Sequence, residues 1–126
     1  QGTNAVAIGH GAGETSQGTG SVAVGQNAGQ TSQGVNSVAV GNAAGQTSQG
    51  GSSTAIGPGA GKTSQGGQSL AIGGNAGETL QGSASIAIGS TAARVSQGGL
   101  DVELSKWEHP QVLEDLLGVV SSISGS

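Results

Sequence analysis

The sequence predicts an all-β fold, a parallel β-solenoid of six coils with 16 residues each. Three observations predict it. Short apolar runs such as residues 37–41 end in a glycine every 16 residues, and a Gln-Gly pair recurs at the same interval. Glycines also interrupt the chain too often for helices of ordinary length. A fixed period in this range is typical of stacked structural units that each contact only their neighbours.

Each repeat is expected to contain one short strand at its apolar run. In residues 37–41, Val38 and Val40 face one way and Ser37 and Ala39 the other, because side chains alternate along a strand. The β-branched residues on one face favour a strand over a helix. We expect each strand to pair with its equivalent in the next coil, about 4.8 Å away.

Equivalent positions form columns, and two of these columns predict a core and an interface. We expect an aliphatic column to face inward as the core, beside a similar column that begins at Val6. The core column comprises Ile8, Val24, Val40, Ile56, Ile72 and Ile88. An alanine column on the opposite face never varies, which indicates close packing against other chains. This predicted oligomer interface comprises Ala7, Ala23, Ala39, Ala55, Ala71 and Ala87.

Two aliphatic columns make a thin core for a chain of this length. We therefore expect several chains to pack together, with a homotrimer as the favoured closed arrangement. Gln17 and its equivalents are expected to form an amide ladder, each side chain bonding to the next. The column that begins at Glu14 carries either charge, which predicts that it faces solvent.

The repeat pattern breaks after Gly99, and a different segment follows. Alternation in residues 100–104 predicts one last strand, and residues 105–108 match a capping box at a helix start. Apolar residues between 112 and 123 then fall on one helical face. We expect two regions, a β-solenoid domain at 1–99 and a capping and trimerisation segment at 100–126.

Within the second region, Leu113, Leu116 and Leu117 are expected to contribute to the oligomer interface. The same helix admits an alternative role in binding a partner, since residues 113–117 fit a short Leu-x-x-Leu-Leu pattern. Because the chain begins inside the repeat phase, we expect it to be part of a longer protein.

Composition excludes several function classes. The net charge is −4, with 3 basic and 7 acidic residues and no basic stripe, which argues against nucleic-acid binding. No apolar run approaches the ~20 residues that span a bilayer, so we expect no membrane insertion. His10 and His109 lie far apart without cysteines or paired carboxylates, so no metal site is expected. No catalytic group or cofactor site is found, and the chain is not expected to be an enzyme.

The apolar runs AVAIG, SVAVG, STAIG, SLAIG and SIAIG resemble the head repeats of trimeric autotransporter adhesins, whose signature strand is Ser-Val-Ala-Ile-Gly. The intervening Ala-Gly-x-Thr-Ser-Gln-Gly segment is similar to repeats in surface or fibre proteins of large algal viruses and phages. The resemblance covers residues 1–98. It implies a left-handed parallel β-roll, trimerised about a central axis and displayed outside the cell, on a bacterial surface or a virion.

The expected function is therefore a structural and adhesive segment of a trimeric surface fibre that attaches to a host cell. Its ligand would be a host-surface glycan or protein. Residues 1–99 contain no aromatic side chain on which a sugar ring stacks, so an alternative is a spacer without a ligand. A second alternative is an ice-binding solenoid, because a threonine recurs in each coil from Thr15 to Thr79.

Overall fold

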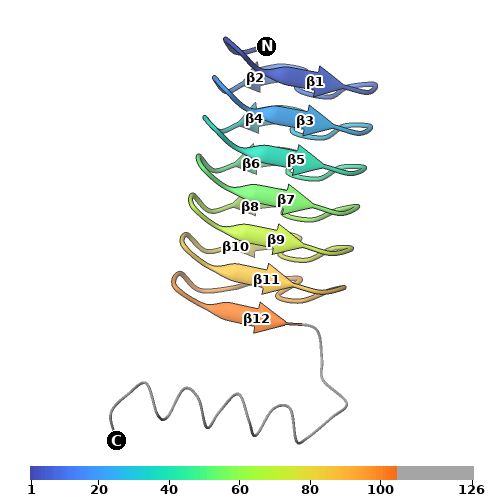
Figure 1. Cartoon of the computed structure of the whole chain (residues 1–126). Coiled ribbons are helices and arrows are strands. Elements are labelled where there is room, and N and C mark those ends of the chain that lie inside the picture. Colours follow the sequence, from blue (N-terminus) through green and yellow to red (C-terminus); the bar gives the residue numbers. More distant parts are fainter. Residues whose placement is uncertain (105–126) are drawn as a thin grey trace, which may run out of the picture.

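The computed structural model describes residues 1–104, and these form a parallel β-solenoid of about six turns (Figure 1). The predicted fold class is confirmed. Each coil contributes one strand to a first sheet, and five of the coils contribute one to a second sheet that lies behind the first. Strands account for all the regular secondary structure in residues 1–104.

The apolar runs form the first sheet, as the sequence predicts. Its seven strands are β1 (Val6–Ile8), β3 (Val22–Val24), β5 (Val38–Val40), β7 (Thr54–Ile56), β9 (Leu70–Ile72), β11 (Ile86–Ile88) and β12 (Val102–Leu104). Neighbours pair in parallel with equivalent residues opposite each other, as Ala23 is opposite Ala39. Each residue in these strands therefore pairs with the residue 16 positions further along the chain.

The second sheet comes from the Thr-Ser-Gln segments, which the sequence analysis did not assign to strands. Its five strands are β2 (Thr15–Gln17), β4 (Thr31–Gln33), β6 (Thr47–Gln49), β8 (Thr63–Gln65) and β10 (Thr79–Gln81). The middle residue is left-handed, with φ of 59° at Ser32, so only the outer residues of each strand pair with the next coil. The chain therefore bends within each of these strands.

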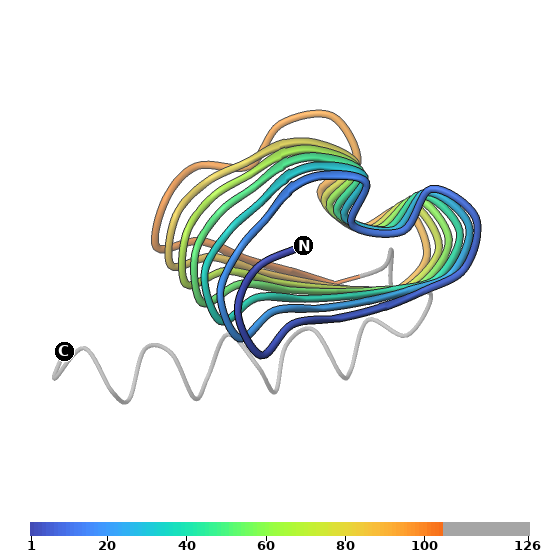
Figure 2. The same ribbon diagram turned by 90° about the horizontal axis from the view of Figure 1, so that it is seen from above.

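Glycines allow the coils to stack with their backbones in contact. A Cβ on Gly34 would lie 2.5 Å from the carbonyl carbon of Gly50 in the next coil. Gly41 has φ of 125°, a conformation that residues with a side chain rarely adopt. The view along the rod shows the result, because successive coils nearly superimpose (Figure 2).

The strand predicted in residues 100–104 is confirmed as β12, which pairs with β11 through Ile86 and Val102. The first sheet thus continues past Gly99. The predicted helix, with Leu113, Leu116 and Leu117, lies outside the described residues.

The core of the coils consists of small side chains. Two alanine columns are buried inside the solenoid, and from the second coil to the fifth their exposed fraction is 0%. These columns are Ala23, Ala39, Ala55, Ala71 and Ala87, and Ala28, Ala44, Ala60, Ala76 and Ala92. Serines and glutamines fill the remaining interior.

The core column predicted from the sequence is wrong. Ile8, Val24, Val40, Ile56, Ile72 and Ile88 all lie on the outer side of the first sheet, where Ile8 is 59% exposed. The reason is the width of the coil: a Cβ placed on Gly61 would lie only 3.3 Å from the Ala55 Cβ across the interior. Such a narrow space accepts alanine and excludes valine or isoleucine.

Candidate interaction surface

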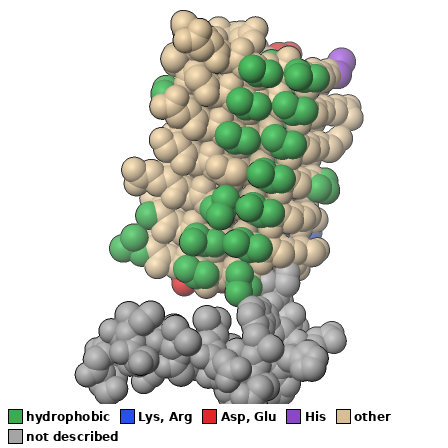
Figure 3. Space-filling view, in the orientation of Figure 1, with side chains coloured by type: hydrophobic (Ala, Val, Ile, Leu, Met, Phe, Trp, Pro, Cys, Tyr) green, Lys and Arg blue, Asp and Glu red, His purple; other side chains and the backbone are tan. Residues whose placement is uncertain are grey.

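An aliphatic stripe runs the length of the first sheet on its outer side (Figure 3). It has two side-chain columns, and their members are Val6, Val22, Val38, Thr54, Leu70, Ile86 and Val102, and Ile8, Val24, Val40, Ile56, Ile72, Ile88 and Leu104. Seven strands at the usual spacing make a stripe about 29 Å long. Thr54 is its only polar member.

The stripe is continuous and open to solvent in the single chain. Val6, Ile8, Ile56, Ile88 and Val102 are exposed, and the other members are half-buried by their neighbours in the column. Single exposed aliphatic residues are common on protein surfaces, but contiguous apolar patches mark interaction sites. Figure 3 shows the stripe as a continuous apolar feature on this face of the rod.

The interface predicted on the alanine column is wrong for the same reason as the core. Ala7, Ala23, Ala39, Ala55, Ala71 and Ala87 point into the coil, and all but the first are fully enclosed by their own chain. No second chain reaches an enclosed side chain. The uniformity of the column reflects the size limit of the interior, and the apolar surface that is open to solvent is the aliphatic stripe on the other face.

Glutamines tie the two sheets together across the interior. The Gln17 side chain is 5% exposed, and its Nε2 donates to the Val6 carbonyl oxygen at 2.7 Å. Gln33 makes the same bond to Val22, and the pattern repeats to Gln97. The predicted amide ladder is therefore wrong, because each amide bonds across its coil and none bonds to its equivalent in the next.

Serines add a second set of interior hydrogen bonds. Ser37 Oγ donates to the Gly34 carbonyl oxygen at 2.7 Å and also lies 3.3 Å from the Gln49 Oε1. One hydroxyl proton serves only one acceptor at a time. The equivalent glutamine oxygens in the other coils, such as that of Gln33, have no partner. The interior therefore contains many polar groups beside its alanines.

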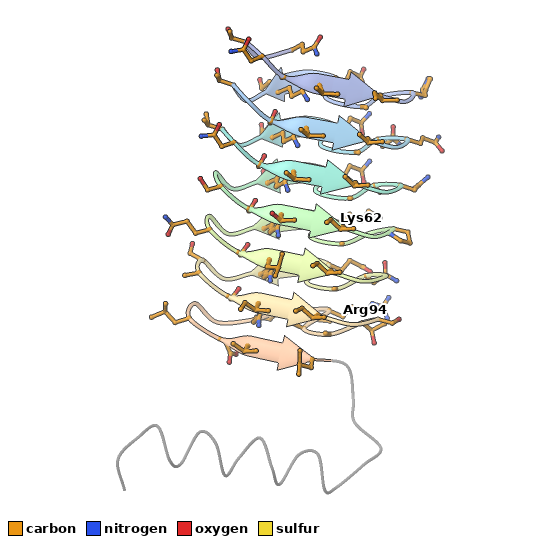
Figure 4. The ribbon with its side chains drawn as sticks, viewed as in Figure 1. Lys62 and Arg94 are labelled. Atoms are coloured by element: carbon orange, nitrogen blue, oxygen red, sulfur yellow. The ribbon has the colours of Figure 1, made fainter. Side chains whose placement is uncertain are left out.

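One edge of the rod carries polar side chains that bond from coil to coil. Gln30 Nε2 donates to Glu14 at 2.8 Å, and Gln46 Nε2 donates to Gln30 at 2.9 Å. Lys62 and Arg94 lie along the same edge (Figure 4). Arg94 forms an ion pair with Glu78 at 3.5 Å, and its side chain is 58% exposed. Exposed pairs of this kind contribute little to stability.

Residues 1–104 hold no group of three or more His, Asp or Glu side chains placed to bind a metal ion. His10 is exposed in the turn that follows β1, and His109 lies outside the described residues. Within the same part of the chain, no helix has the length and hydropathy that a bilayer crossing needs.

Three exposed apolar residues lie away from the stripe near the last coils, and sequence analysis assigned them no role. They are Leu80, Val95 and Leu100, with exposed fractions of 56%, 69% and 86%. The available signal was their departure from the repeat. Leu80 stands where earlier coils have serine, and Val95 stands where they have threonine.

Comparisons with protein-family models, with curated proteins and with solved structures found no match to this chain.

Proposed function

We propose that this chain is a structural and adhesive segment of a trimeric surface fibre, displayed outside the cell on a bacterium or a virion. The observation that carries the proposal is the aliphatic stripe, which runs along a rod whose interior is already filled. A solvent-exposed stripe of this length is stabilised when other copies of the same chain cover it.

The shape of the stripe favours a closed ring of chains over an open assembly. It is only two side chains wide, and it follows the axis of the rod from β1 to β12. Three such stripes that face a common axis form one apolar column inside a rigid fibre. This arrangement keeps the predicted trimer but moves its interface from the alanines to the aliphatic residues.

The outer surface that remains after such assembly is mainly polar and nearly neutral. Residues 1–99 carry Glu14 and Glu78 against Lys62 and Arg94. A surface of hydroxyl and amide groups without aromatic rings suits a shallow polar contact with a host glycan or protein. Length, rigidity and display are the contribution that the stacked coils make to attachment.

Solution mass tests the assembly. The chain should form one species at three times its mass of 11.8 kDa. Val40→Glu places a charge in the stripe and should yield monomers, whereas Thr47→Glu places the same charge on β6 in the other sheet and should leave the trimer intact. A monodisperse monomer for the unmodified chain would overturn the proposed interface.

Binding tests the adhesive part separately. The assembled chain, displayed on beads, should bind host cells or glycans on an array more strongly than beads that carry an unrelated solenoid. A trimer that binds neither would be a spacer, which is the alternative kept from the sequence. Thermal hysteresis at high protein concentration would instead favour the ice-binding alternative.

A further inference from the structure

Two exposed apolar side chains lie in adjacent coils at the end of the second sheet, away from the aliphatic stripe, and we call this pair the patch. Leu80 belongs to β10, and Val95 lies in the next coil. The backbone bonds that join these coils place them side by side: Thr79 N donates to the Arg94 carbonyl at 2.9 Å, and Gln97 N donates to the Leu80 carbonyl at 3.1 Å. Both side chains are mostly exposed, at 56% and 69%.

The patch departs from the repeat at two columns. The equivalents of Leu80 are Ser16, Ser32, Ser48, Ser64 and Ser96. The equivalents of Val95 are Thr15, Thr31, Thr47, Thr63 and Thr79. Four earlier coils thus keep both positions polar, and the change occurs only where the described chain approaches its end.

The backbone makes Leu80 an unfavourable choice for this position. Its φ is 58°, a left-handed conformation that is uncommon for bulky residues. Serine occupies the same conformation in the coils above, with φ of 58° at Ser64. Leu80 is strained and exposed, so it adds little stability to residues 1–104 through packing. Backbone strain of this kind is found at functional contacts.

We propose that residues 111–123 of the same chain pack on the patch formed by Leu80 and Val95. The sequence predicts an amphipathic helix there, with Val112, Leu113, Leu116, Leu117 and Val120 on one face. This segment begins seven residues after Leu104. Its own apolar face needs a partner, and the patch lies in the last coils before it.

The connection is long enough for this contact. Residues 105–110 span up to about 20 Å when extended. The two sheets of a solenoid coil are separated by about 10 Å, so the chain can pass from β12 in the first sheet to the outer side of the second. Arg94 adjoins Val95 at the rim of the patch, where it is 58% exposed and already paired with Glu78.

The contact is independent of the proposed trimer, because the patch and the aliphatic stripe lie on opposite sheets. A cysteine pair tests it directly, since the chain has no native cysteine. Leu80→Cys is combined in turn with L113C, L116C and L117C, and Ser32→Cys, at the equivalent position on β4, serves as the matched control. At least one Leu80 pair should form an intrachain disulfide in high yield, and no Ser32 pair should. Only interchain disulfides, or equal yields at both sites, would overturn the proposal.

A second variant removes the patch without weakening the solenoid. The double variant L80S/V95T restores the residues of the repeat, so the coils should keep their stability and the oligomer its mass. Amide exchange in residues 105–126 should accelerate at least tenfold, and Trp107 emission should shift to longer wavelength. Unchanged exchange and emission would contradict the proposal. A monomeric mass for the unmodified chain, with the intrachain crosslink still formed in the L80C variants, would instead contradict the proposed trimer alone.

Discussion

Replacing Ala39 with valine adds two methyl groups to a side chain that is fully enclosed within its coil, with an exposed fraction of 0%. The adjacent coils leave no room, because Ala23 and Ala55 lie directly above and below it in the column. Overpacking of a filled interior costs about 1–3 kcal/mol. A domain of this size has a total stability of about 5–15 kcal/mol, so the loss is measurable. A melting temperature lowered by roughly 5–20 °C is expected.

Circular dichroism during heating and urea titration measures this loss. The matched control is Val40→Ile, which adds one methylene at the next residue but on the outer side of β5. Isoleucine already occupies that column at Ile56 and Ile72, so the change should stay within about 0.5 kcal/mol. If Ala39→Val were neutral and Val40→Ile costly, the inward and outward faces described above would be reversed.

Three further comparisons test the stacking, the interior bonds and the polar edge. Gly41→Ala should cost at least about 1–3 kcal/mol, because φ is 125° and the new Cβ would lie 2.8 Å from the next coil, whereas Gly74→Ala meets no atom closer than 4.0 Å and should leave the melting temperature unchanged or higher. Gln33→Ala removes a buried hydrogen bond to the Val22 carbonyl and leaves a space inside the coil, so it should cost about 1–3 kcal/mol in urea unfolding. Gln46→Ala on the outer edge should cost less than about 0.5 kcal/mol, and equal losses would contradict the distinction between interior and edge. Arg94→Ala should change stability by no more than about 0.5 kcal/mol, at low or high salt, and a larger loss in low salt would show that the edge is more than a solvated ion pair.

The period of the sequence was sufficient to predict the solenoid, the first sheet and its register. Stacked equivalents pair with each other, so the interval between Ala23 and Ala39 in the chain is also the step from strand to strand. The glycine that closes each apolar run was likewise visible. Its role is geometric, since the backbone of the next coil occupies the space that a side chain would need.

Alternation alone did not predict which face of each first-sheet strand points into the coil. Alternation separates Ala39 from Val38 and Val40, but it is symmetric and does not state which set faces inward. The usual rule that larger apolar residues are buried fails here because the glutamines of the second sheet already occupy part of the interior, and the space left beneath the first sheet fits only small side chains. The informative signal was that the alanine column never varies, because the space inside the coil at this position is too small for a larger side chain.

The second sheet was missed because its strands are short, polar and left-handed at the middle residue. Ser32 has φ of 59°, which alternation and β-propensity do not anticipate. The buried amide of Gln33 was missed for a related reason: glutamine is mostly found exposed, and only the coil geometry brings its Nε2 to the Val22 carbonyl.

The distribution of apolar groups joins the fold to the proposed assembly. Inside the coils the buried apolar side chains are alanines, so hydrogen bonds between coils and close backbone contact hold much of the single rod together. Most of the valines, leucines and isoleucines of residues 1–104, which release the most free energy on burial, lie outside the coils along the aliphatic stripe. A chain folded alone leaves that contribution unused, and it is recovered only when the stripe is covered. Under the proposed assembly, folding of the coils and association of the chains are coupled. The narrow interior leaves the large aliphatic side chains outside, and these are the side chains that the other copies would cover.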